Sequence, residues 1–97
     1  MTKSQSTTLA LYHYDSCPFC AKTRRSIDEL NVDVELRNIQ LNHQHRIDLQ
    51  QGGDKTQVPC LRIEDSNGET QWLYESDDII HYLAQQQNEL YRITRMA

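Results

Sequence analysis

The chain has 97 residues, of which 25% are charged and 37% hydrophobic, and it carries a formal net charge of −4 at pH 7. A chain of this size forms one domain that buries roughly two-thirds of its unfolded surface. The acidic balance argues against a nucleic-acid partner, because phosphate contacts need clustered Lys and Arg, and no apolar stretch reaches the ~20 residues that span a bilayer. We therefore expect a single domain over residues 1–97, with neither nucleic acid nor a membrane as partner.

The first half of the chain predicts two strands separated by a helix. A loose polar lead-in over residues 1–6 precedes a strand from Thr7 to Tyr14, which is rich in β-branched and aromatic residues around alternating apolar positions. Apolar residues at helical spacing then predict a helix from Pro18 to about Leu30. The run Val32 to Leu36 alternates apolar and charged residues, which is typical of a second strand.

The middle of the chain predicts a second helix and a hairpin. Asn42 is a capping residue for this helix, and Gly52-Gly53 would end it, because glycine takes the left-handed conformation that closes helices. The hairpin joins a strand from Cys60 to Glu64 with a return strand from Gln71 to Leu73. Between them stands Asn67-Gly68, a strong hairpin-turn signal.

The last helix begins at Ser76, which is expected to be its N-cap. Asp77 and Asp78 follow in the first turn, where acidic side chains interact favourably with the helix dipole. Residues 86–97 either extend this helix or fray from it. The predicted order β-α-β-α-β-β-α is that of an α/β domain built on one sheet.

Cys17-Pro18-Phe19-Cys20 lies at the junction of the first strand and the first helix. Free backbone N–H groups and the helix dipole stabilise an anion at a helix N-terminus, so Cys17 is predicted to be a nucleophilic thiolate. Pro18 suits the first helical position, where its missing N–H has no consequence. Cys20 is one turn further along on the same face. The motif therefore predicts a redox-active dithiol.

The same spacing of two cysteines also occurs in metal sites. A zinc site needs two more ligands, and Cys60 and His13 are the nearest candidates, because the chain has no second C-x-x-C and no H-x-x-x-H. The apolar run Leu9 to Tyr12 is too short for a signal-peptide core, which predicts a cytoplasmic protein. In that reducing compartment three cysteines indicate catalysis or metal binding before a structural disulfide. We expect no metal; a zinc or iron–sulfur site remains the alternative.

Three motifs together resemble the glutaredoxins of the thioredoxin fold. They are Cys17-Pro18-Phe19-Cys20, Gln57-Val58-Pro59 and Glu75-Ser76-Asp77-Asp78-Ile79. The last is also similar to the N-terminal domain of glutathione transferases, and the resemblance extends from about Leu9 to Leu83. It implies a thioredoxin-like fold, with a four-stranded mixed sheet flanked by helices.

The resemblance also implies roles for individual residues. Cys17 would be the nucleophile and Cys20 the resolving thiol, and the bond before Pro59 would be cis, with the backbone of Val58 beside the dithiol to pair with a substrate. The expected glutathione-binding residues are Phe19, Lys55, Gln57, Val58, Pro59, Glu75, Ser76 and Asp77. General chemistry agrees, because a carboxylate fits a helix N-terminus and an acidic side chain beside it can hold an ammonium group.

Four polar or cationic side chains are candidates to bind the carboxylate at the glycyl end of glutathione. Lys55 and Gln57 flank the proline loop and could reach the glycyl carboxylate of glutathione, and Arg37 and Arg62 are weaker candidates for the same carboxylate. Cys60 is expected to be a small buried hydrophobe, with a role as an alternative resolving thiol as the other possibility.

Two departures from the family pattern are informative. Family members often carry a lysine shortly before the first cysteine, where this chain has Tyr14-Asp15. Stabilisation of the Cys17 thiolate then depends on the helix N-terminus together with Lys22 or Arg24. The second, helical domain of glutathione transferases is not in this sequence, so a conjugating activity is not expected.

The resemblance implies a monomeric thiol–disulfide oxidoreductase with glutathione as co-substrate. Its partners would be proteins that carry a disulfide or a mixed disulfide with glutathione. Two alternatives remain open: a thioredoxin-like reductant that uses thioredoxin reductase, and a non-enzymatic module that binds glutathione or an iron–sulfur cluster.

Overall fold

The computed structural model describes residues 7–96, and the side chains of residues 7–87. The lead-in expected over residues 1–6 lies outside them. The elements are β1 (Thr8–His13), α1 (Pro18–Leu30), β2 (Glu35–Asn38), α2 (His43–Gly53), β3 (Cys60–Glu64), β4 (Thr70–Tyr74) and α3 (Ser76–Met96). The predicted order is confirmed, and the C-terminal tail continues α3 to Met96. Within residues 7–96, none of the helices combines the length and apolar character that crossing a bilayer requires.

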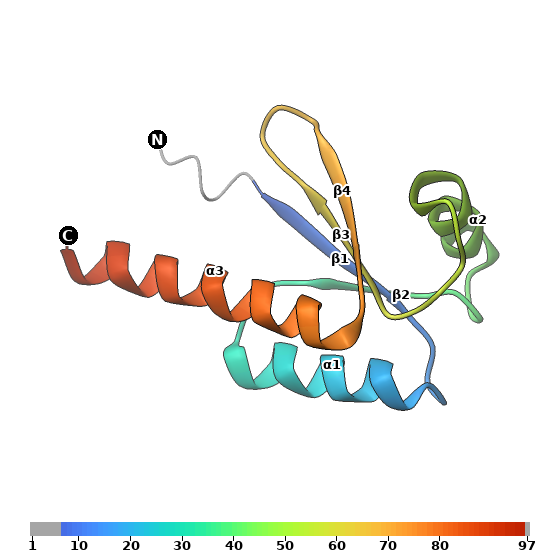
Figure 1. Ribbon diagram of the computed structural model, residues 1–97, viewed down its shortest axis with the longest axis horizontal. Helices are drawn as coiled ribbons and strands as arrows, with labels where there is room; N and C mark the ends of the chain where they lie inside the picture. Colours follow the sequence, from blue (N-terminus) through green and yellow to red (C-terminus); the bar gives the residue numbers. More distant parts are fainter. Residues whose placement is uncertain (1–6, 97) are drawn as a thin grey trace.

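One mixed sheet of four strands, in the order β2-β1-β3-β4, forms the middle layer of the domain. β1 and β2 are parallel and are connected through α1, whereas β3 runs antiparallel to both β1 and β4. Figure 1 shows α1 and α3 side by side on one face of the sheet, with α2 on the other. This is the thioredoxin-like fold that the resemblance implies.

The central strand β1 is buried on both faces of the sheet. Alternate side chains of a strand point to opposite faces, and here Leu11 packs on the side of α1 and α3 while Tyr12 packs on the side of α2. Both are completely buried. The chain that leaves β1 is therefore firmly held where it turns into α1, which is where Cys17 lies.

The second strand begins three residues later than the alternation in the sequence predicts. Asn31, the C-cap of α1, has a left-handed backbone (φ 58°), and the chain returns to the sheet through residues 32–34. Val32 and Val34 pack against the core from this connection, and pairing with β1 starts only at Glu35. Leu36, the last apolar residue of the alternating run, is 49% exposed.

The two glycines are the last residues of α2, as the sequence predicts, but neither takes the left-handed conformation expected of them. The residue with positive φ is Asp54 (φ 70°), whose backbone N–H bonds the carbonyl of Gln50. The glycines are instead points of close approach to the sheet, because a Cβ on Gly52 or Gly53 would collide with the ring of Trp72 or the hydroxyl of Tyr74. The Tyr74 hydroxyl also donates to the Gly53 carbonyl at 2.9 Å.

A single residue, Glu75, connects β4 to α3. Glu75 has a left-handed backbone (φ 76°), and its carbonyl accepts the N–H of Ile79 at 3.0 Å. Ser76, which the sequence predicts to be the N-cap, is instead the first residue of the helix, and the residue before the helix is Glu75. A left-handed glutamate costs roughly 1 kcal/mol or more, so packing of β4 and α3 must hold this connection in place.

Candidate active site

The two thiols of the C-x-x-C motif occupy the first turn of α1. Cys17 is the N-cap, with extended backbone angles, and its Sγ accepts the N–H of Cys20 at 3.2 Å. Pro18 fills the first helical position. Because the sulfur of Cys17 receives one of the free N–H groups of the helix and lies at the positive end of its dipole, negative charge on this sulfur is stabilised.

Burial separates the chemistry of the two thiols. All three cysteines are free, and Cys20 is completely buried, whereas Cys17 retains 6% exposure. Burial raises the pKa of Cys20 well above its ordinary value, and the hydrogen bond with Cys17 raises it further. Cys20 therefore keeps its proton at neutral pH, which leaves Cys17 as the candidate nucleophile.

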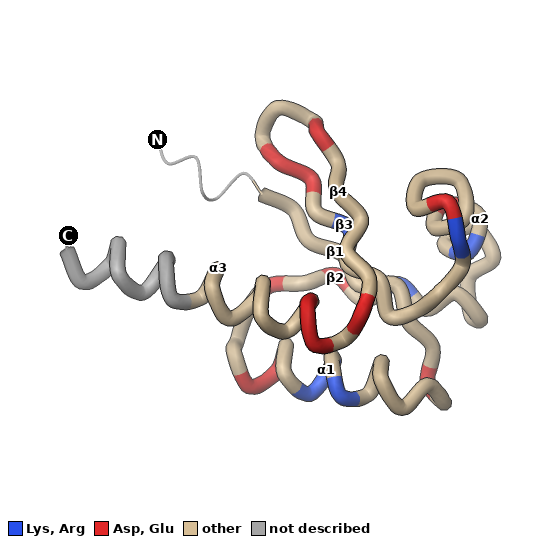
Figure 2. Tube along the Cα trace, in the orientation of Figure 1, with Lys and Arg blue, Asp and Glu red and all other residues tan. Residues whose placement is uncertain are grey.

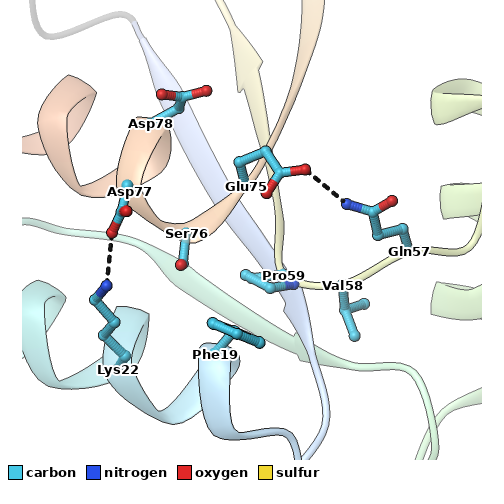
Figure 3. A pocket seen from close by; sticks show the side chains of 9 residues that line it. All are labelled: Phe19, Lys22, Gln57, Val58, Pro59, Glu75, Ser76, Asp77 and Asp78. Carbon is cyan, nitrogen blue, oxygen red and sulfur yellow. Dashed lines mark hydrogen bonds and ion pairs between the residues drawn. The ribbon is translucent and has the colours of Figure 1, made fainter.

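A pocket of about 470 Å³ lies beside the start of α1, between the α2–β3 connection and the start of α3 (Figure 3). Its volume falls within the range of small-molecule sites. The lining residues are Phe19, Lys22, Gln57, Val58, Pro59, Glu75, Ser76, Asp77 and Asp78. The Val58–Pro59 bond is cis, as the resemblance implies.

The structure brings seven of the eight expected glutathione-binding residues to this pocket. Lys55 is not among the lining residues, because its Nζ lies over the Tyr74 ring, 4.5 Å from the ring centroid. Two lining residues were missed, Lys22 and Asp78. Little in the sequence placed these two residues in the pocket, since charged side chains near the start of a helix are ordinarily solvated.

Charges of both signs meet at the rim of the pocket. Figure 2 shows acidic residues gathered in the first turn of α3 and basic residues along α1. Lys22 Nζ pairs with Asp77 Oδ1 at 2.6 Å across this gap, while the Asp78 carboxylate points away from Lys22 (Figure 3). Because both partners of the pair are solvent-exposed, it adds little to stability. The Asp77 carboxylate is thus already placed to hold a cationic group.

The weaker cationic candidates lie on the opposite face of the sheet. Arg37 stacks over the ring of Tyr12 and Arg62 over the ring of Trp72, at 5.5 and 5.8 Å from the ring centroids. Each forms an ion pair with a neighbouring glutamate at 3.0 Å. They line a second pocket against α2 and are not part of the pocket beside the start of α1, whose lining residues also do not include Cys17 or Cys20.

Cys60 is completely buried in the core on the α2 face. Burial raises the pKa of its thiol to about 11. The thiol therefore stays protonated and packs as a small apolar side chain. Among the side chains of residues 7–87, no three His, Cys, Asp or Glu groups come together in a way that could hold a metal ion.

A buried histidine lies at the end of β1, just before the dithiol. His13 is 5% exposed, and its Nδ1 is 3.0 Å from Nη1 of Arg24. Burial lowers the pKa of His13, and the charge of Arg24 lowers it further, against a smaller opposing effect of Asp15. The imidazole is therefore neutral at pH 7 and resists protonation.

This histidine is expected to make stability depend on pH. Below the ordinary pKa of 6.5, the unfolded chain takes up a proton that folded His13 refuses, so the free energy of unfolding falls as pH is lowered, by at most about 1.4 kcal/mol per pH unit. The loss continues until the pH reaches the lowered pKa of the folded state. Urea unfolding between pH 5 and 7.5 in roughly half-unit steps measures it. His13→Gln should flatten the slope, whereas the exposed His81→Gln should leave it unchanged; equal slopes in wild type and His13→Gln would contradict this origin.

Comparison with known proteins gives one family and several relatives. The family model for the glutathione S-transferase N-terminal domain matches residues 11–90. Glutaredoxin 2 of Escherichia coli (strain K12) is 39% identical over 75 residues, which cover 77% of this chain and 32% of that protein. Glutaredoxin 1 of Rickettsia prowazekii (strain Madrid E) is 30% identical over 67 residues, covering 66% of this chain and 70% of the relative. The chain thus spans about a third of the length of the E. coli protein.

A solved structure is similar over most of the chain. Maleylacetoacetate isomerase from Anaeromyxobacter dehalogenans 2CP-1, with GSH bound in its active site, superposes with a TM-score of 0.66 at 27% sequence identity. The match covers 87% of this chain and 39% of the isomerase.

Proposed function

The chain belongs to the glutathione S-transferase N-terminal domain family and is a homologue of the glutaredoxins, and we propose that it is a glutathione-dependent thiol–disulfide oxidoreductase. It reduces protein disulfides and protein–glutathione mixed disulfides through Cys17 and Cys20, as a monomer in the cytoplasm. The observation that carries this proposal is the Cys17 sulfur at the N-terminus of α1, where it accepts the Cys20 N–H at 3.2 Å.

The proposed reaction has two exchange steps. The Cys17 thiolate attacks the glutathione sulfur of a mixed disulfide; a Cys17–glutathione bond forms, and the electron pair of the old S–S bond goes to the protein sulfur, which takes up a proton. The thiolate of a second glutathione then attacks the glutathione sulfur on Cys17. Glutathione disulfide leaves, and the Cys17 thiolate is regenerated, so the net reaction consumes one glutathione and converts the mixed disulfide into a protein thiol and glutathione disulfide.

Two features of the pocket support glutathione as the co-substrate. Its γ-glutamyl end carries a carboxylate and an ammonium group, and the start of α3 offers backbone N–H groups for the first and the Asp77 carboxylate for the second. Ser76 is nearly buried at this helix start, and its hydroxyl points into the pocket (Figure 3). The ring of Phe19, which stands between the two cysteines in the sequence, lines the pocket and is exposed to a bound ligand.

Turnover with alternative electron donors tests the proposal. We expect wild-type protein to reduce a glutathionylated peptide with glutathione and glutathione reductase, and to show no comparable rate with thioredoxin reductase or in conjugation of 1-chloro-2,4-dinitrobenzene. Turnover only with thioredoxin reductase would establish the thioredoxin-like alternative. Visible absorbance and bound iron after anaerobic purification, without turnover, would establish the cluster-binding module.

A matched pair of variants tests the ammonium contact. Asp77→Asn is expected to raise the KM for glutathione about 10-fold with kcat within about 2-fold of wild type, because a charge-assisted contact worth about 1.4 kcal/mol is lost. Asp78→Asn makes the same change of charge one residue further along, where the carboxylate points away from Lys22, and it should leave KM within about 2-fold of wild type. Equal effects of the two substitutions would show that only the overall charge of the rim matters.

A further inference from the structure

Three cations lie on α1, the helix that begins with the dithiol: Lys22, Arg24 and Arg25. Lys22 is engaged with Asp77 across the pocket. Arg25 is exposed. Arg24 is partly buried and lies four residues after Cys20, on the same face of the helix. Of these three side chains, Arg24 is the one whose guanidinium contacts the end of β1, close in the chain to the dithiol.

Two acceptors at the end of β1 fix the guanidinium of Arg24. Its Nη1 is 3.0 Å from Nδ1 of His13 and donates to the Tyr14 carbonyl at 3.3 Å. A guanidinium can only donate, so Nδ1 of His13 accepts and the histidine proton resides on Nε2. The neutral state of buried His13, which follows from its lowered pKa, is what allows it to serve as this acceptor.

The backbone of Tyr14 connects Arg24 with both thiols. The Tyr14 carbonyl accepts the N–H of Cys17 at 3.4 Å as well as the Arg24 guanidinium. Burial raises the pKa of Cys20 and the hydrogen bond with Cys17 raises it further, while a backbone hydrogen bond at Tyr14 and, as the smallest contribution, the charge of Arg24 lower it. The positive charge therefore lies where it favours the thiolate of the buried cysteine.

We propose that Arg24 is a positioning residue for the dithiol: held by His13 and the Tyr14 carbonyl, it supplies the positive charge that favours attack of Cys20 on a mixed disulfide at Cys17. The inference rests on the proposed function for its physiological substrate. Cys20 gives its proton to water, and its thiolate attacks the Cys17 sulfur. The Cys17–Cys20 disulfide forms while the bond to glutathione breaks, and the electron pair goes to the glutathione sulfur, which takes up a proton.

The test isolates this step with a thiol that has no γ-glutamyl group. Reaction with 5,5′-dithiobis(2-nitrobenzoate) forms a Cys17–thionitrobenzoate mixed disulfide, and attack by Cys20 releases the second thionitrobenzoate, which absorbs at visible wavelengths. The rate of this second release is measured by stopped flow across the pH range for wild type and variants. A Cys20→Ser variant, which cannot perform the second step, fixes the baseline.

Arg24→Gln is expected to slow the second release by up to about 3-fold at each pH. The rise in the Cys20 pKa lowers the thiolate fraction, while the greater nucleophilicity of the more basic thiolate offsets part of the loss, so that each pKa unit changes the rate roughly 3-fold. Arg24→Lys retains the charge and should stay within about 2-fold of wild type. Arg25→Gln, a neutralisation at the adjacent exposed position, should have no effect.

Several results would overturn the role of Arg24. They are an unchanged rate in Arg24→Gln, a loss of rate in Arg24→Lys as large as that in Arg24→Gln, or an equal loss in Arg25→Gln. If Arg24→Gln does not fold, His13→Leu removes the main acceptor of Arg24 and is expected to slow the same step, and an unchanged rate there would also overturn the role. Because the probe needs no glutathione recognition, a protein that shows the Arg24 effect but no glutathione turnover would refute the proposed function alone.

Discussion

Replacing Cys17 with serine is expected to abolish reduction of mixed disulfides by glutathione, with kcat/KM lowered by roughly 10³-fold or more, because a serine hydroxyl is not ionised at neutral pH and is a poor nucleophile toward sulfur. The substitution preserves the N-cap, since serine is a preferred residue at that position, so the loss is chemical. The measurement is coupled turnover of a glutathionylated peptide with glutathione and glutathione reductase, alongside thermal unfolding to verify the fold.

The other two cysteines provide matched controls for this variant. Cys20→Ser should retain turnover within about 3-fold of wild type, because a second glutathione can resolve the intermediate at Cys17. Cys60→Ser changes a thiol on the opposite face of the sheet and should leave the chemistry intact even where it lowers stability. Residual activity in Cys17→Ser, or equal loss in all three variants, would remove Cys17 from the role of nucleophile.

The second large effect is expected at Gly52, where alanine should destabilise the protein by about 1–2 kcal/mol. In an exposed helix the same substitution would stabilise by up to about 1 kcal/mol. Here a Cβ would overlap the ring of Trp72, and overpacking of this kind costs about 1–3 kcal/mol. Urea unfolding followed by circular dichroism measures the difference, with the midpoint and slope compared between variants.

A double-mutant cycle identifies the cause of this loss. In a Trp72→Leu background the clash is gone, so Gly52→Ala should become neutral or stabilising, with a coupling energy of about 1–3 kcal/mol between the two positions. If Gly52→Ala destabilises equally in both backgrounds, the glycine is required for a reason other than its contact with the indole ring.

The order of elements was predictable because each element carries its own local signal. The alternation of β1, the proline after Cys17 and the Asn67-Gly68 turn each report on their immediate neighbours. Gly52 and Gly53 were misread because glycine has two uses, positive φ and close approach, and the second depends on Trp72 and Tyr74, which are about 20 residues away. The late start of β2 has a similar cause, since pairing partners are not local.

The difference between local signals and contacts distant in the sequence also decides which parts of the site were predictable. The cysteines and the cis-proline loop carry a recognisable motif, so the sequence alone brought most of the pocket together. The partner of Lys22 is 55 residues away, and that of Arg24 is a histidine whose burial depends on tertiary packing. Such pairings between polar side chains far apart in the sequence leave no spacing pattern. Lys55 shows the converse, because its place beside the loop did not predict that it packs on Tyr74.

Trp72 is the only tryptophan in the chain, and its position has a spectroscopic consequence. The indole lies 5.5 Å from the ring of Tyr12 and against Gly52, on the face that α2 covers, whereas the thiols begin the helix on the other face. Fluorescence excited where only indole absorbs therefore reports how α2 is seated on the sheet. Oxidation of the dithiol is therefore expected to leave the indole emission unchanged. The molecule carries two separate optical reporters, indole fluorescence for its folding and thiolate absorbance for its chemistry.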